Sequence, residues 1–276
     1  MDLQFAYLKE EYIMIDRITD AIKSAVENGD VSGANVLVIQ NGSEKAYCQY
    51  GMRDIENSKP VERDTIFRLY SQTKPITAAA AVLLASEGRL EIGAWLSDYL
   101  PEFGQSYVNI DGVRREAKNH ITVGDLLNMT SGIPYPDENT VGGRQSGTAF
   151  WTVENRLYSD SPVTTAEFAE MMSKVELCFE PSERFMYGAS ADVLGALIEK
   201  ISGMSFRDFL TERFFRPLGM NDTDFYVPAD KSDRLAKVYD YSENGLHELR
   251  TNHLGLAYDR DIIPAFQSGG AGLCST

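Results

Sequence analysis

One segment of the chain reads Phe67-Arg68-Leu69-Tyr70-Ser71-Gln72-Thr73-Lys74-Pro75-Ile76-Thr77, and the apolar run Ala78 to Ala85 follows it. Residues 65–69 have the composition of a strand and turn. Residues 71–87 favour a helix, because alanine and leucine have high helix propensity and a proline is tolerated in a first turn. The run is almost entirely apolar, which predicts a central helix that is covered on every side.

Ser71 and Lys74 stand three residues apart at the start of this expected helix. Positions i and i+3 share a helix face, so the lysine amine can lie within hydrogen-bond reach of the serine hydroxyl. A helix N-terminus also favours negative charge that develops on the serine oxygen. An SxxK pattern is expected about once by chance in a chain of this size, but a rigid place at the head of an apolar helix distinguishes this one. The pattern therefore predicts a nucleophile and a base that work without histidine.

The sequence lacks the familiar signatures of several other catalytic classes. Neither GxGxxG nor a GxxxxGKS or GxxxxGKT loop, which bring backbone amides to a pyrophosphate, occurs in it, and the nucleophile elbow GxSxG is missing as well. The histidines His120, His247 and His253 form no HExxH motif and no pair one helical turn apart. We therefore expect neither a metal nor a cofactor.

The charge balance of the chain restricts its partners. Its 276 residues include 26 Lys and Arg against 41 Asp and Glu, a formal net charge of -15. Such a surface repels phosphate backbones and anionic headgroups, so we expect no nucleic acid and no membrane as partners. The longest apolar run is far shorter than the roughly 20 residues that cross a bilayer. The first residues lack the basic and apolar regions of a signal peptide, which predicts a cytoplasmic location.

The three cysteines, Cys48, Cys178 and Cys274, are far apart in the sequence and odd in number. This usage indicates neither a disulfide framework nor a CxxC metal or redox site. We expect them to be small buried hydrophobic residues.

Turn residues and hydrophobic periodicity divide the rest of the chain into hairpins and helices. The strand-like runs 34–40 and 44–50 flank Asn41-Gly42, the strongest short signal for an antiparallel hairpin. Asp111-Gly112 indicates a small second hairpin, and Thr122 is the expected cap of a helix. Further helices are expected over residues 12–28, 165–174, 190–201 and 205–215.

The stretch from Pro134 to Pro162 is rich in Gly, Ser, Asn and Asp, and aromatic residues are scattered through it. It has the composition of a long loop. Loops of that length in compact domains are usually functional lids or mobile segments, and a short helix hidden by the composition is an equally ordinary explanation. The sequence leaves both interpretations open.

Four ordered segments resemble motifs of one known family. Residues 67–77 look like the nucleophile segment of the serine β-lactamase and penicillin-binding-protein superfamily, in particular its class C-like branch of family VIII carboxylesterases. Residues 121–134 are similar to the family's helix-to-loop segment, residues 187–195 to its tyrosine motif, and residues 215–223 to the turn that follows. Four motifs in order are far more specific than one.

The resemblance implies an α/β (α+β) fold of the β-lactamase type, with an antiparallel sheet flanked by helices and an inserted, mostly helical region. Residues 1–70 and 190–276 would then form the α/β region, and residues 71–189 the helical region that carries the nucleophile helix and the active-site loops. The family's third element, a Lys- or His-initiated triplet on a central strand, lies well beyond a segment like residues 267–276. The C-terminal strands are therefore expected to be absent from this chain.

The resemblance also assigns roles to individual residues. Ser71 would be the acylated nucleophile, Lys74 its proton acceptor, and Tyr187 the base or acid that serves the leaving group and the deacylating water. The sequence does not decide whether Lys74 or Tyr187 takes the first proton, and the two would titrate as a coupled pair. Tyr135 and Trp151 are candidates for the acyl pocket, as is Tyr158.

Position 189 is a departure from the family pattern. Many relatives have Asn or Ser two residues after the tyrosine, where the side chain helps to hold a lactam or amide carbonyl, whereas this chain has Ala189. An ester needs less polar contact because its leaving group is better. Ala189, as a substrate-binding position, therefore favours esterase or acyl-transfer activity over lactam recognition.

We therefore predict a serine hydrolase that acts through an acyl-enzyme on a small-molecule ester or amide. The alternatives are β-lactamase or D-amino-acid peptidase activity, or a non-catalytic binding module on the same scaffold. In relatives the missing part supplies one of two oxyanion-binding amides, and losing such a donor costs about 10²–10³ in turnover. We accordingly expect weak activity of these residues alone, and self-association or a completing chain at the open sheet edge.

Overall fold

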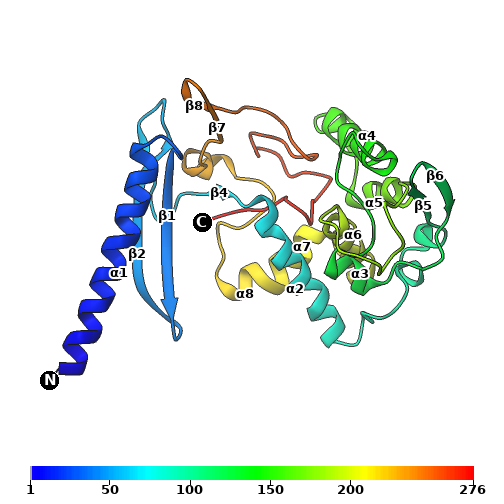
Figure 1. Ribbon diagram of the computed structural model, residues 1–276, viewed down its shortest axis with the longest axis horizontal. Helices are drawn as coiled ribbons and strands as arrows, with labels where there is room; N and C mark the ends of the chain where they lie inside the picture. The colour runs from blue at the N-terminus through cyan, green and yellow to red at the C-terminus, as the bar shows by residue number, and fades with distance from the viewer. Residues whose placement is uncertain (1) are drawn as a thin grey trace. The chain divides into compact units, whose positions relative to one another are not determined.

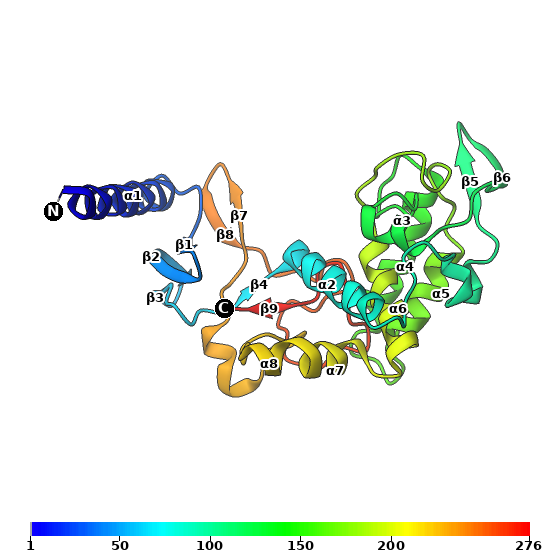
Figure 2. The same cartoon turned by 90° about the horizontal axis from the view of Figure 1, so that it is seen from below.

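The computed structural model describes residues 2–276, with side chains from residue 15 onward (Figures 1 and 2). Its contacts divide the chain into two compact units, which we describe separately. The first unit contains the chain up to Phe67 together with Ala229–Arg250 and Thr276. The second contains Arg68–Pro228 and Thr251–Ser275.

The first unit is built on an antiparallel hairpin. Strand β1 (Gly33–Gln40) pairs with β2 (Ser43–Asp54), and β3 (Lys59–Pro60) extends the sheet beside β2. Helix α1 (Asp2–Glu27) runs along this hairpin (Figure 1). A second hairpin, β7 (Tyr239–Ser242) and β8 (Gly245–Glu248), follows a 3-10 turn, Ala229–Arg234.

The predicted turn of the first hairpin is confirmed in detail. Gln40 faces Ser43 across Asn41 and Gly42, whose φ angles are 53° and 74°. Two consecutive left-handed residues make the mirror-image turn that matches the twist of the strands, and Asn-Gly is the sequence that adopts it most easily. Asp111 and Gly112 form the same turn between β5 (Tyr107–Ile110) and β6 (Val113–Glu116) in the second unit.

The second unit is mostly helical, as Figures 1 and 2 show. Its longer helices are α2 (Thr73–Ser86), α3 (Val123–Asn128), α4 (Val141–Arg156), α5 (Thr165–Ser173) and α6 (Ser190–Ser202). Its remaining elements are short: strand β4 (Phe67–Arg68) at the boundary between the units, 3-10 turns at Tyr70–Gln72, Leu96–Asp98 and Pro101–Phe103, α7 (Phe206–Leu210), a π-helical turn at Thr211–Phe215, α8 (Arg216–Leu218) and β9 (Cys274–Ser275). The β-lactamase-like fold class with α+β content is confirmed.

Helix α6 is the buried centre of this unit, and the expectation for α2 is wrong on this point. Every residue from Ser190 to Ile198 is buried, and α6 contacts α2, α3, α5 and α7. Helix α2 buries one stripe that includes Ala80 and Leu84, and leaves Val82 49% exposed. Alanine counts as apolar but is small, so an alanine-rich helix needs no complete cover.

The helices of residues 134–228 differ from the sequence expectation in two ways. Residues 141–156 form α4, which settles the open choice in this stretch in favour of a helix. Thr140 caps this helix. The small buried residues Gly142, Gly143 and Ser146 form the first half of its inner face, so its hydrophobic period is weak. Of residues 190–276, which the sequence assigns to the α/β region, residues 190–228 and 251–275 group with the helical unit, where α6 packs against α2 and α3.

No helix within residues 2–276 combines the length and the apolar character needed to cross a membrane.

The buried carboxylate of Asp125 joins three segments of the second unit. Asp125, 3% exposed, accepts hydrogen bonds from the backbone and hydroxyl of Thr122 and from the hydroxyls of Thr130 and Ser182. Thr122 caps α3 as predicted. Burial raises the pKa of Asp125, but the hydrogen bonds from Thr122, Thr130 and Ser182 outweigh it, so the pKa lies below the ordinary value.

We expect the D125A variant to lose roughly 3 kcal/mol of unfolding free energy, because several donors lose a charged acceptor in a buried place. Because the pKa of Asp125 is lowered in the folded state, this contribution is present at neutral pH and is lost as the pH falls through and below the ordinary aspartate range. Urea unfolding at several pH values measures both effects.

Glu167 provides the matched control, because it makes the same capping box with Thr164 at the exposed start of α5. The E167A variant should lose only about 1 kcal/mol. Equal losses in the two variants would show that capping alone, and not the buried network, accounts for the role of Asp125.

Candidate active site

Ser71 lies at the junction between a 3-10 turn, Tyr70–Gln72, and α2. The residue before it, Tyr70, has a φ angle of 44°, which is strained for a side chain of this size. Leu273 holds the junction in place: its carbonyl accepts from the Leu69 N–H at 2.9 Å, and its own N–H donates to the Thr73 hydroxyl at 3.1 Å. The Ser71 side chain is thereby fixed at the head of the helix.

The Lys74 amine contacts three oxygens from three separate segments. Its Nζ donates to Ser71 Oγ at 3.1 Å, to the Tyr135 hydroxyl at 3.1 Å and to the Gly270 carbonyl at 2.8 Å. A lysine ammonium has three protons to donate, and each of these oxygens can accept one of them. The predicted contact between Lys74 and Ser71 is present, whereas the partners Tyr135 and Gly270 were not predicted.

Tyr187 completes the arrangement from the other side. Its hydroxyl donates to Ser71 Oγ at 2.7 Å, and the centre of its ring lies 4.6 Å from Lys74 Nζ. Partial burial raises the pKa of Tyr187, but hydrogen bonds with Lys74 and Ser71 and the positive charge of Lys74 outweigh this, so the pKa lies below the ordinary value of a tyrosine. Ser71 therefore has two neighbours that can exchange a proton with it.

The backbone around Tyr187 is held against the segment that follows α3. Met186 N–H donates to the Met129 carbonyl, and a Cβ added to Gly188 would stand 2.0 Å from the Ile133 carbonyl oxygen. Only glycine permits this close approach of two backbones. Gly188 thus places Tyr187 beside Ser71 for a steric reason.

A cavity of about 480 Å³ opens beside Ser71 and Tyr187. Trp151 is 64% exposed at this cavity, whereas Phe150 is buried behind it. The lining is largely apolar and aromatic, with one carboxylate and one imidazole: Ser71, Tyr135, Pro136, Gly147, Phe150, Trp151, Glu154, Tyr187, His253 and Leu254. Its size and aromatic lining fit a small organic substrate.

The structure brings together some predicted site residues and not others. Ser71, Lys74 and Tyr187 meet in one place, and Tyr135 and Trp151 line the adjoining cavity. Ala189 is fully buried at the start of α6 and is outside this cavity lining, as is Tyr158, which is 60% exposed on the surface. Position 189 therefore offers no contact to a substrate in this cavity.

Sequence reasoning missed the contributions of residues 251–273. Leu254, at the cavity, and Gly270, on Lys74, both come from this segment. It contains no strand and no hydrophobic period, so no pattern marks it. The only available signal is the run Ser268-Gly269-Gly270, whose glycines permit close backbone packing.

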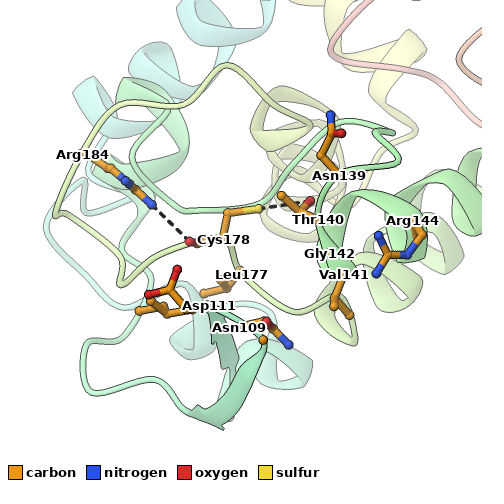
Figure 3. Close-up of a pocket in the computed structure, with 12 residues that line it drawn as sticks. Asn109, Asp111, Asn139, Thr140, Val141, Gly142, Arg144, Leu177, Cys178 and Arg184 are labelled. Atoms are coloured by element: carbon orange, nitrogen blue, oxygen red, sulfur yellow. Dashed lines mark hydrogen bonds between the residues drawn. The ribbon is translucent and has the colours of Figure 1, made fainter.

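A second cavity, of about 450 Å³, lies between the β5–β6 turn and the start of α4 (Figure 3). Cys178 lines it, with its Sγ 3.7 Å from the Thr140 hydroxyl and its carbonyl accepting from Arg184. Burial raises the pKa of the Cys178 thiol, which keeps the thiol protonated and unreactive. Cys178 and Cys48 are only partly buried, contrary to expectation, whereas Cys274 is buried.

Similar proteins of known family identify the class to which this chain belongs. Residues 18–276 match the family model named Beta-lactamase, and the chain belongs to that family. It is 31% identical over 261 residues to Protein Rv1367c of Mycobacterium tuberculosis, covering 93% of this chain and 62% of that protein. Protein flp of Staphylococcus aureus is 30% identical, with 82% of this chain and 41% of that protein covered. The chain thus spans less than two thirds of the length of these curated relatives.

Solved structures agree with this assignment. EstCE1, described as a hydrolase with promiscuous acyltransferase activity, has a TM-score of 0.80 and 25% identity, covering 96% of this chain and 70% of its own. A penicillin-binding protein homologue from Pyrococcus abyssi has a TM-score of 0.68 and 25% identity, covering 95% of this chain and 53% of its own. The resemblance found in the sequence to the β-lactamase and penicillin-binding-protein superfamily is confirmed.

The lowered pKa of Tyr187 is testable without any substrate. In an alkaline ultraviolet titration, Tyr187 should ionise before tyrosines such as Tyr135, whose pKa is raised by burial and by the charge of Asp192. The Y187F variant should lose this early phase. In the K74A variant the phase should move to higher pH, because the phenolate loses its neighbouring positive charge. An early phase that survives in Y187F would contradict the assignment.

Proposed function

We propose that this protein is a serine hydrolase that cleaves a small ester, or an amide, through an acyl-enzyme on Ser71. One observation carries the proposal: Ser71 Oγ receives hydrogen bonds from both Lys74 Nζ and the Tyr187 hydroxyl at the mouth of an aromatic cavity. A hydroxyl is a weak nucleophile by itself and needs a positioned base. Lys74 and Tyr187 both contact the Ser71 hydroxyl and can exchange a proton with it, so they meet that need.

In the first step Ser71 Oγ attacks the substrate carbonyl carbon, and its proton passes to the Tyr187 oxygen. The lowered pKa of Tyr187 makes the phenolate accessible, and the Lys74 ammonium stabilises it. The protonated Tyr187 then donates to the leaving alcohol or amine, which leaves an ester on Ser71. Water, or a second alcohol, attacks that ester with Tyr187 again as base, and the free serine returns.

An ester is the favoured substrate for two reasons. Ala189, where many relatives carry a polar residue that holds a lactam or amide carbonyl, is buried away from the cavity. An ester has a better leaving group and depends less on such a contact. EstCE1, whose structure is similar to 96% of this chain, is described as a hydrolase with promiscuous acyltransferase activity. This description supports hydrolysis or acyl transfer as the reaction class.

Covalent labelling tests the nucleophile. Incubation with a fluorophosphonate should add one phosphonyl group to the intact protein, and peptide mapping should place it on Ser71. The S71A variant should remain unlabelled, because the attacking oxygen is gone. Ser86 lies exposed at the other end of α2, and S86A should label like the unmodified protein. A folded protein that gains no adduct would support the non-catalytic binding module instead.

The pH dependence of ester cleavage tests the base. Tyr187 must be deprotonated to accept the proton, so kcat/KM should rise with pH, with the midpoint of the rise below the ordinary tyrosine pKa of about 10. Y187F should lower kcat/KM by on the order of 10²–10⁴-fold and remove this rise. A chromogenic short-chain ester supplies the assay, and a chromogenic cephalosporin assayed in parallel tests lactamase activity. An unchanged profile in Y187F would assign the base to another group.

A further inference from the structure

A carboxyl group lies fully enclosed behind the lysine and takes no part in the steps above. Asp192 is 1% exposed, in the first turn of α6. Its Oδ1 accepts from the Ser268 hydroxyl at 2.5 Å and from the Gly270 N–H at 3.0 Å. Its side chain also accepts a hydrogen bond from the Tyr135 hydroxyl, and it interacts electrostatically with Lys74. Burying a carboxyl group is costly, so a set of donors this complete marks a specific role.

Asp192 reaches Lys74 along two routes. In the first, the Gly270 N–H donates to Asp192 while the Gly270 carbonyl accepts from Lys74 Nζ at 2.8 Å. In the second, the Tyr135 hydroxyl donates to Asp192 while it accepts from Lys74 Nζ at 3.1 Å. Asp192 thus orients two of the oxygens that accept hydrogen bonds from the Lys74 amine.

The packing around Gly270 leaves no freedom in this arrangement. A Cβ added at Gly270 would stand 2.6 Å from Asp192 Oδ2 and 2.6 Å from the Tyr135 hydroxyl. The Ser268 hydroxyl, which donates to Asp192, also accepts from the Ala271 N–H at 3.0 Å. The turn of residues 268–271 is therefore closed around the carboxyl group.

A simple helix-capping role does not explain these contacts. An acidic residue in a first turn commonly stabilises its own helix through the backbone N–H groups there. The Asp192 carboxyl instead bonds the distant segment 268–270 and Tyr135. Its contacts point toward Lys74 and away from its own helix end.

We propose that Asp192 is a positioning residue, which holds the Tyr135 hydroxyl and the Gly270 backbone so that the Lys74 amine stays in contact with Ser71 and Tyr187. This role rests on the proposed hydrolase function for its effect on catalysis, but not for its effect on the lysine. The ionisable groups that face Lys74 are Tyr135, Tyr187 and Asp192, and those that face Asp192 are Lys74 and Tyr135.

The D192N variant tests the proposal with little change in shape. Its amide oxygen can still accept from Ser268 and Gly270, but its NH₂ then faces the Tyr135 hydroxyl as a donor. That hydroxyl would meet two donors, the new amide and Lys74, and its own proton would lose its acceptor, so the Tyr135 hydroxyl must shift or turn away from Lys74. We expect kcat for ester cleavage to fall by on the order of 10²-fold with KM unchanged, because a small misplacement of a catalytic group has that effect.

The Y135F variant removes only the hydroxyl from the same chain of hydrogen bonds. It should lower kcat by a similar factor. The double variant D192N/Y135F should have a kcat no lower than that of either single variant, because both substitutions break the same chain of hydrogen bonds. Glu167 is the matched control, since it is also an acid in a first turn, on α5. E167Q should keep the kcat of the unmodified protein. Additive losses in the double variant would overturn the proposal.

The titration of Tyr187 separates positioning from a plain charge effect and needs no turnover. The charge of Asp192 opposes the Tyr187 phenolate, so D192N would lower the pKa of Tyr187 if charge were the whole effect. If Asp192 positions Lys74, D192N should raise that pKa, because the displaced ammonium no longer stabilises the phenolate. A downward shift overturns the proposal. If D192N does not fold, Y135F gives the same readout, and an unmoved Tyr187 titration there overturns it.

The two proposals can fail separately. If the unmodified protein neither cleaves esters nor reacts with the fluorophosphonate, the hydrolase function is wrong. An upward shift of the Tyr187 titration in D192N would still support the positioning role in that case. If the unmodified protein is active and D192N shows neither a loss of kcat nor an upward shift, Asp192 is only a structural residue.

Discussion

The three hydrogen bonds of the Lys74 amine determine how the rest of the site is built. They join the start of α2, the segment after Ile133 and the turn at Gly270, which are remote in the sequence. An ammonium group with a missing acceptor in such a partly buried place is costly. The elements around Lys74 must therefore hold its three acceptor oxygens in position at once. The buried parts of the helical unit provide this support.

The start of helix α6 holds two residues that act on the site around Lys74. Tyr187 stands just before the helix and contacts Ser71, whereas Asp192 lies in its first turn and reaches the acceptors of Lys74. Because α6 is the most completely buried helix of its unit, neither residue can move independently of the core. The Asp125 network fixes the neighbouring loop in the same way, through Thr130 and Ser182. The packing of the core and the positions of Tyr187 and Asp192 are thus coupled through α6.

Local signals predicted much of this structure, and long-range contacts account for what they missed. Ser71 with Lys74, the Asn41-Gly42 turn and the Thr122 cap depend on residues three or four positions apart, which a sequence displays directly. The contacts of Lys74 with Gly270 and of Asp192 with Ser268 span separations of 196 and 76 residues, and no periodicity encodes them. Helix α4 was left open for another reason: the first half of its inner face is built from Gly and Ser, which allow close packing but are typical of a loop sequence.

The polar groups behind Lys74 depend on one another. The Lys74 amine donates to the Tyr135 hydroxyl, which in turn needs an acceptor for its own proton. The carboxyl group of Asp192 is that acceptor, and its other lone pairs are taken by Ser268 and Gly270. Each polar group thus requires the next, so Lys74, Tyr135 and Asp192 belong to one arrangement of the site.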